Sequence, residues 1–118
     1  MEYLLMATET EDAFAARTDP ERTDEYWSAW TGFIAELAAS GVMTAAAGLV
    51  PPTSSTTLRV RDGERSVQDG PFSDSKEHLG GYFVIDVADL DEALAWAARC
   101  PSAGYASVEV RPLLVMPD

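Results

Sequence analysis

The chain has 118 residues, of which 47% are hydrophobic and 24% charged, so residues 1–118 are expected to form one folded domain with a single core. Twenty acidic residues against eight basic ones give a net charge of −12. This charge would repel a phosphate backbone or an anionic membrane surface, so the composition argues against nucleic-acid and membrane partners.

The cysteine count and the N-terminal residues predict a cytoplasmic protein. Cys100 is the only cysteine and forms no disulfide within the chain, which is typical of a reducing compartment. The first residues lack the basic start and the cleavage site of a signal peptide, and no apolar run approaches the roughly 18 residues of a membrane span. Phosphate-loop, zinc-site and calcium-loop motifs are missing from the sequence, so we expect no cofactor and no metal.

The chain opens with a predicted strand, a connection and a helix. Residues 3–7 form a short apolar run suited to a buried strand, and the polar residues 9–19 are expected to connect it to the helix. Thr18 followed by Glu21 has the spacing of a capping box that starts a helix, and Gly41 is expected to end it. A broad apolar stripe runs along this helix and consists of Tyr26, Trp27, Trp30, Phe33, Ile34 and Leu37.

A second strand and a hairpin follow. Residues 42–50 are small and apolar and predict a strand that ends before two prolines. Residues 56–61 alternate between apolar and polar side chains, as a half-exposed strand does. Asp62 and Gly63 are the strongest short hairpin signal, so residues 65–68 are expected to return as the partner strand.

The last third predicts a strand, a helix and a strand. Residues 82–87 are the clearest strand of the chain, and Asp89 with Glu92 forms a second capping box. The helix that it opens is expected to turn Leu90, Ala93, Leu94 and Ala97 inward. Residues 107–113 alternate as a final strand. The resulting βαββαβ order predicts an α+β, ferredoxin-like antiparallel sheet with a hairpin insertion and both helices on one face.

Two helices cover one face of such a sheet, so the residues of the other face support a separate prediction. The core beneath the helices is assigned Phe83, Ile85, Val87, Val108 and Val110. The opposite face mixes apolar and charged groups, namely Tyr82, Val84, Asp86, Glu109, Arg111 and Leu113. Such a face is either solvated, with Glu109 and Arg111 as neighbours, or covered by a second copy with a cavity between the copies. We favour the homodimer.

Residues 68–82 collect the side chains best suited to chemistry on a loop that begins with the turn-forming Asp69-Gly70-Pro71. Asp69 is a candidate general base, or else a turn acceptor; His78 is a candidate acid near neutral pH, or else a solvated side chain. Ser73 is expected to cap a short helical turn through residues 76–78. The candidate ligand-binding residues are Phe72, Lys76, Glu77, Tyr82 and Arg111, and their alternatives are solvated charges, a core anchor for the loop and dimer contacts.

The same stretch carries a family resemblance. Asp69-Gly70-Pro71-Phe72, followed by Lys76-Glu77 and by Leu79-Gly80-Gly81-Tyr82, resembles the signature of the DGPF branch of the YCII-related proteins. The helix around Ala93 and the ending from Val108 to Leu113 are similar to the C-terminal half of that family, and Tyr3-Leu4-Leu5 fits its N-terminal half. The resemblance covers nearly the whole chain.

The resemblance implies a bacterial, cytoplasmic, dimeric α/β-barrel protein with a ligand site in the cleft between the sheet and its loops. Most members have no assigned reaction, and some are encoded beside sigma factors of the extracytoplasmic-function type or fused to them. One YCII branch includes a dehydrochlorinase-like activity that uses a His–Asp pair. The N-terminal half of this chain has no histidine, so that pair is not carried over.

Two functions follow as hypotheses. The first is a homodimer that binds a small polar or aromatic molecule and catalyses a proton transfer or elimination, with Asp69 as base, His78 as acid, and Arg111 and Lys76 as charge stabilisers. The alternative is a non-catalytic regulatory or interaction module whose acidic N-terminal helix meets a basic partner such as a sigma-factor region.

Overall fold

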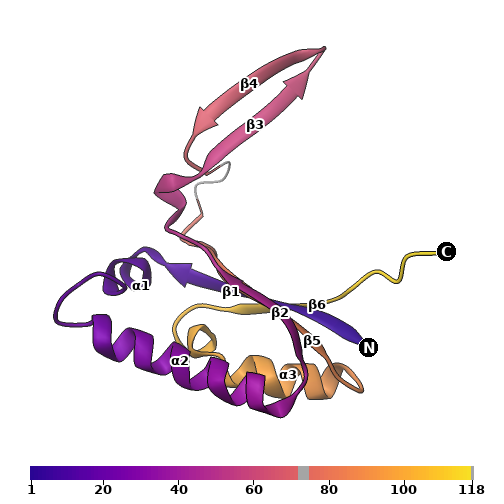
Figure 1. Ribbon diagram of the computed structural model, residues 1–118. Coiled ribbons are helices and arrows are strands. Elements are labelled where there is room, and N and C mark those ends of the chain that lie inside the picture. The colour runs from indigo at the N-terminus through magenta and orange to yellow at the C-terminus, as the bar shows by residue number, and fades with distance from the viewer. Residues whose placement is uncertain (72–74, 118) are drawn as a thin grey trace.

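The computed structural model describes residues 1–71 and 75–117. A four-stranded antiparallel sheet carries two helices on one face, and a two-stranded hairpin stands apart from it (Figure 1). The sheet order is β2-β5-β1-β6, with β1 at Glu2–Thr10, β2 at Met43–Gly48, β5 at Glu77–Asp86 and β6 at Val108–Pro112. The other elements are α1 (Glu11–Ala16), α2 (Thr23–Ser40), η1 (Pro52–Ser54), β3 (Thr56–Arg61), β4 (Glu64–Asp69), α3 (Leu90–Arg99) and η2 (Pro101–Gly104). The predicted ferredoxin-like α+β plan is confirmed.

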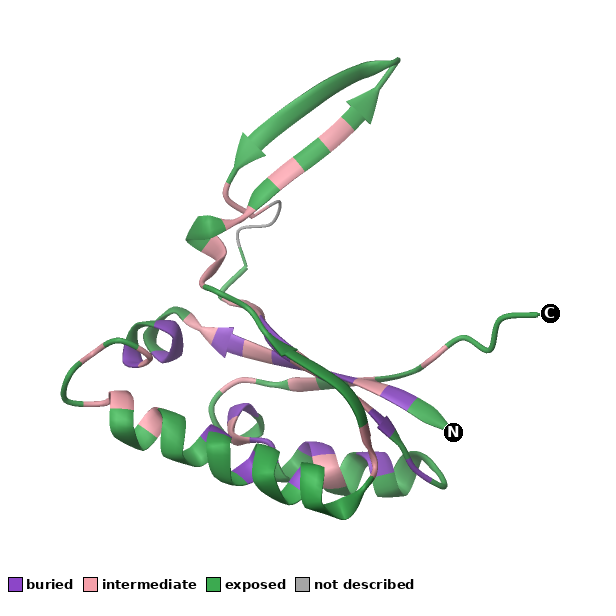
Figure 2. Cartoon of the chain, viewed as in Figure 1, coloured by how far each residue is buried: buried purple, intermediate pink, exposed green. Residues whose placement is uncertain are grey.

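Alternation along the two central strands produces the core. Odd-numbered residues of β1 are buried from Tyr3 to Glu9, and Phe83 and Ile85 of β5 are buried on the same helix-covered side (Figure 2). From α2, Trp30 stacks on Phe83 with ring centroids 6.3 Å apart, and Phe33 meets Phe83 edge-on at 5.4 Å. The face assignment made for the strands is confirmed: Phe83, Ile85 and Val87 are buried, and Val108 and Val110 pack against them.

The helix ends follow their capping chemistry in two places out of three. Gly41 ends α2 at φ 80°, and the Asp89 carboxylate accepts from Glu92 N at 2.9 Å to start α3, as predicted. The capping box at Thr18 is wrong, because α2 begins at Thr23 and the nearby Asp19 carboxylate accepts from Glu21 N instead.

Two further expectations fail for reasons of local packing. In α3 only Ala93 and Ala97 are buried, whereas Leu90 and Leu94 are each 47% exposed, because the helix packs on the sheet through its small residues. Residues 9–19 are not a plain connection, since β1 runs on to Thr10 and the Thr10 hydroxyl then accepts from Ala13 N at 3.1 Å to cap α1.

The predicted helical turn at residues 76–78 is also wrong. Glu77 and His78 belong to β5, where they pair with Thr10 and Glu9 of the extended β1. A long central strand needs a partner for each backbone group, and that demand draws residues 77–81 into the ladder. The neighbouring residues 72–74, which include the predicted anchor Phe72, lie outside the described residues.

The insertion is a hairpin, as predicted. β3 and β4 pair from Thr56 with Asp69 to Arg61 with Glu64. Asp62 at φ 52° and Gly63 at φ 79° have the two left-handed conformations of a type I′ turn, which explains the Asp-Gly pair. None of the helices in the described part of the chain has the length and apolar character of a membrane span.

Candidate functional site

A cavity of about 750 Å³ opens between α2, the end of β2 and the segment at residues 49–51. Its walls are mostly aromatic and aliphatic, with contributions from Tyr26, Trp27, Trp30, Ile34, Leu49, Val50 and Phe83. Glu9 and Arg17 supply the charged part of the lining. A concave, largely apolar site with a few converging polar groups is the usual form of a small-molecule pocket.

The predicted apolar stripe of α2 explains how this cavity is built. Trp30, Phe33 and Leu37 are buried in the core, but Trp27 and Ile34 are 46% and 39% exposed. Trp27 and Ile34 both line the cavity. The apolar stripe of α2 therefore extends beyond the residues that pack on the sheet. Its remaining members, Trp27 and Ile34, form one wall of the cavity.

Glu9 is a carboxylate with 1% exposure at the end of β1. Its Oε2 accepts from the Tyr26 hydroxyl at 2.8 Å, and its Oε1 accepts from the Tyr105 hydroxyl at 2.5 Å. Arg17 Nε lies 4.0 Å from Oε2. Burial of a charge is costly unless it is paired and hydrogen-bonded, and these three groups meet that requirement.

Arg17 ties the charged part of the cavity to the surrounding backbone. Its Nε donates to the Tyr26 hydroxyl at 3.0 Å, Nη2 donates to the carbonyl of Gly80 at 3.2 Å, and Nη1 donates to the carbonyl of Leu49. The guanidinium also lies over the ring of Phe14, with 4.8 Å from Cζ to the centroid. One side chain thus holds β1, α2, β5 and residue 49 around the cavity.

Two glycines allow this close approach. A Cβ at Gly80 would lie 2.4 Å from Cγ of Glu9, and a Cβ at Gly81 would lie 3.0 Å from the carbonyl oxygen of Ala47. Gly80 therefore makes room for the buried carboxylate, and Gly81 lets β2 reach β5 beside it. Any larger residue at position 80 displaces Glu9.

A second cavity of about 340 Å³ lies on the other side of Tyr26 and includes Thr10, Tyr105 and Trp30 in its lining. Partial burial raises the pKa of Tyr26 to about 12, with a further contribution from the adjacent Glu9. Burial and Glu9 raise the pKa of Tyr105 as well. Both tyrosines therefore stay protonated and remain donors to Glu9. Trp30 Nε1 is buried and has no hydrogen-bond partner among the described residues.

The structure places the sequence-predicted site residues outside both cavities, as far as it describes them. Asp69 is exposed at the end of β4, and Lys76 is exposed just before β5. His78 comes nearest, because it is the cross-strand partner of Glu9 and directly opposed residues share a face of the sheet. Phe72 lies outside the described residues.

Glu77, the first residue of β5, links that strand to β1 and to the residue before β6 at one end of the sheet. Its Oε1 accepts from the hydroxyls of Thr8 at 2.8 Å and Ser107 at 2.7 Å, and these bonds lower the pKa of the carboxyl. Ser107 N in turn donates to the Thr8 hydroxyl at 3.1 Å. Glu77 lines neither cavity.

Tyr82 and Arg111 lie on the sheet face that the helices leave open. Tyr82 is half-buried, and Arg111 Nε lies 3.7 Å from Glu109 Oε2, with both side chains well exposed. They are therefore on the opposite side of the sheet from Glu9. The sequence-based site and the cavity share the sheet but not a face of it.

Glu9, Arg17 and Tyr26 are the residues that the sequence analysis missed. The signal for Glu9 was present, because Tyr3, Leu5, Ala7 and Glu9 continue one alternation, and the alternation places a carboxylate on the buried face. The double glycine before residue 82 was the second signal, since it marks a close backbone approach.

Comparison with known proteins places the chain in a family. The model of the YCII-related domain matches residues 1–117. An uncharacterised protein of Rhizobium meliloti (strain 1021) is 49% identical over 78 residues, which cover 63% of this chain. The aligned part spans 61% of that relative, less than two thirds of its length.

A solved structure has the same fold. The 5-chloro-2-hydroxyhydroquinone dehydrochlorinase of Burkholderia phenoliruptrix AC1100, in complex with 2,5-dihydroxybenzoquinone, superposes with a TM-score of 0.55 over 97% of this chain and 94% of that one. The two sequences are 14% identical. At that identity the likeness concerns the fold.

Proposed function

The chain belongs to the YCII-related family, and from this premise we propose that it binds a small hydroxylated aromatic molecule in the cavity between α2 and the end of β2. The observation that carries the proposal is Glu9: a carboxylate with 1% exposure that lines an otherwise aromatic and aliphatic cavity. Trp27 and Leu49 both line this cavity, so the ring is proposed to lie against them while its hydroxyl group donates a hydrogen bond to Glu9.

The same arrangement supports proton transfer. A bound hydroxyl that donates to Glu9 can pass its proton to the carboxylate, and the negative charge left on the ring oxygen is stabilised by Arg17 beside it. Loss of the hydroxyl proton to a carboxylate is a first step from which a hydroxylated ring can go on to expel a leaving group, and the dehydrochlorinase with the same fold bears the name of an elimination reaction.

The experiment is a calorimetric titration with 2,5-dihydroxybenzoquinone as the probe. Trp27→Ala and Glu9→Gln are expected to weaken binding at least tenfold. The matched control for Trp27 is Leu94→Ala, because Leu94 is equally exposed at 47% but lies on α3 away from the cavity. Loss of binding in Leu94→Ala as well, or unchanged binding in a folded Trp27→Ala variant, contradicts the proposed site.

A second copy is proposed to cover the open face of the sheet. Leu4, Met6, Tyr82 and Val84 are only half-buried there, and neither of the two packed helices lies on that side (Figure 1). An isologous contact of this kind is the commonest form of homodimer. Light scattering on a sizing column over a dilution series is expected to give a dimer mass; a monomer at every concentration refutes the pairing.

The regulatory alternative rests on charge. The net charge of −12 and the exposed carboxylates Asp24 and Glu25 in the first turn of α2 favour a basic partner, such as a sigma-factor region. Association that weakens steeply with salt would support it. A low-salt pull-down that recovers no basic protein argues against it.

A further inference from the structure

The β3–β4 hairpin stands clear of the rest of the molecule (Figure 1). The chain has a Cα radius of gyration of 16.2 Å, whereas a compact chain of this length has about 13.5 Å. All six residues of β4 are exposed. An isolated two-stranded hairpin is at best marginally stable in water, so a hairpin of this kind needs a surface to pack on.

The hairpin is nevertheless defined at both ends. The type I′ turn at Asp62 and Gly63 closes its tip. At its base, Gly70 N donates to the carbonyl of Ser55 at 2.6 Å, and the Thr57 hydroxyl donates to the carbonyl of Gly70 at 3.0 Å. We name residues 56–69 the arm.

One face of the arm is apolar. Leu58 and Val67 are direct cross-strand partners, and Val60 lies two residues further along the same face. Their exposed fractions are 52%, 60% and 55%. Contiguous exposed apolar side chains on a strand pair are the usual mark of an interface.

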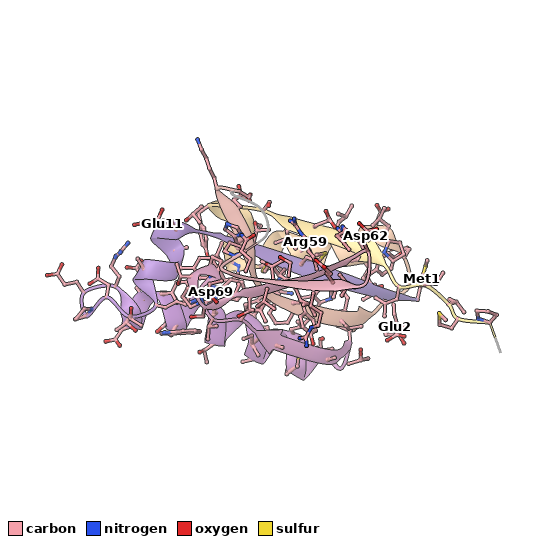
Figure 3. All side chains as sticks on the ribbon, turned by 90° about the horizontal axis from the view of Figure 1, so that it is seen from above. Met1, Glu2, Glu11, Arg59, Asp62 and Asp69 are labelled. Carbon is pink, nitrogen blue, oxygen red and sulfur yellow. The ribbon has the colours of Figure 1, made fainter. Side chains whose placement is uncertain are left out.

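The arm rises on the side of the sheet opposite to the helices. In the side view the arm leaves the sheet at the end of β2, where residues 49–54 connect β2 to β3 (Figure 1). In the view from above, in which Arg59 and Asp62 are labelled, the arm extends over the sheet (Figure 3). We propose that the arm of each copy packs, through Leu58, Val60 and Val67, on a second copy seated against the open face. The inference rests on the proposed homodimer and adds an exchange of arms to it.

The area of the open face supports this occupant. Four strands about 4.8 Å apart and about 25 Å long present roughly 500 Å², whereas a stable interface takes roughly 800 Å² from each partner. Two six-residue strands add roughly 200 Å² from one face of the arm. The sheet alone falls short of a stable dimer, and the arm supplies most of the difference.

Charge supports it as well. The arm holds three of the eight basic residues and three acidic ones, so its net charge is zero and the remainder of the chain carries the whole −12. Arg65 and Arg61 form no ion pair with the described residues. The uncharged arm is therefore the part of this chain that another acidic copy repels least.

The test compares dimer dissociation constants from sedimentation over a dilution series. The triple variant Leu58→Ser, Val60→Ser, Val67→Ser is expected to weaken the dimer at least tenfold. The control changes Ser66→Ala and Gln68→Ser on the other face of the arm and is expected to leave the dissociation constant within twofold of the unchanged chain.

The outcomes separate the two proposals. A dimer of unchanged affinity in the triple variant overturns the arm exchange and leaves the sheet dimer standing, whereas a monomeric unchanged chain overturns both. Hydrogen exchange of the unchanged chain gives a second measurement that needs no variant. Amides of β3 and β4 are expected to be protected at concentrations where the dimer forms and to exchange rapidly in the monomer; rapid exchange in both states overturns the proposal.

Discussion

Two carboxylate–arginine pairs on opposite faces of the sheet have nearly the same separation and very different surroundings. Arg17 Nε lies 4.0 Å from Glu9, and Arg111 Nε lies 3.7 Å from Glu109. Glu9 is 1% exposed and Arg17 13%, whereas Glu109 and Arg111 are 60% and 68% exposed. Coulomb interactions at equal distance differ several-fold between water and a protein interior, so burial rather than distance decides what each pair contributes.

The largest predicted effect is the loss of Arg17. Arg17→Ala leaves Glu9 buried without its cation and removes two bonds to backbone carbonyls, so the free energy of unfolding is expected to fall by about 3 kcal/mol. Arg111→Ala removes an exposed ion pair and is expected to change the free energy of unfolding by less than about 1 kcal/mol. Urea unfolding of both variants measures the difference; equal losses contradict the argument from burial.

The second prediction concerns the space around Glu9. A Cβ at Gly80 meets Cγ of Glu9 at 2.4 Å, so Gly80→Ala is expected to destabilise the fold by about 2 kcal/mol and to weaken ligand binding. Gly32→Ala is the matched control, because a Cβ at Gly32 in α2 has no atom within 4 Å. Alanine favours helix, so the control is expected to gain about 0.5–1 kcal/mol. A neutral Gly80→Ala variant would show that Glu9 moves freely.

Tyr26 provides a pH test of the same cluster. Its folded pKa of about 12 lies above the ordinary value of 10.0, so the folded state holds its proton more tightly than the unfolded chain does. The stabilisation is present in full below pH 10 and is lost as the pH rises from 10 to 12. Thermal unfolding at several pH values is expected to show this loss, and Tyr26→Phe is expected to reduce it. A decline that is identical in Tyr26→Phe assigns it to other groups.

The alternation of apolar and polar residues along the strands predicted the sheet. The same alternation continues to Glu9, but the predicted first strand stopped at residue 7 and so left out the site. Apolar residues at every second position predict a buried face of the strand, here formed by Phe83, Ile85 and Val87. Glu9 continues that pattern from Ala7, but a carboxylate at a buried position is expected only when its partners are known, and Tyr26 and Tyr105 are distant in sequence. Residues 68–82 were predicted to be the site from their composition alone. Composition does not indicate which face of the sheet a side chain occupies.

The smallest effect is expected at Glu77, where a hydrogen-bonded carboxylate lies near water rather than in the core. Bonds from Ser107 and Thr8 lower its pKa below the ordinary value of 4.5. The folded state therefore releases this proton more readily than the unfolded chain, and the resulting stabilisation is present above pH 4.5 and is lost as the pH falls below it.

Glu77→Gln keeps the shape of the side chain and removes its titration. We expect a slight loss of stability at pH 7 and a smaller decline between pH 5 and pH 3 than in the unchanged chain, measured by urea unfolding at each pH. The matched control is Glu109→Gln, whose carboxylate has an exposed ion pair in place of two hydroxyl donors. An acid limb that is unchanged in Glu77→Gln would mean that the bonds from Thr8 and Ser107 form equally well to the protonated acid. In that case neither Glu77 nor Glu109 would stabilise the open face through its charge, in contrast to Glu9 on the buried face.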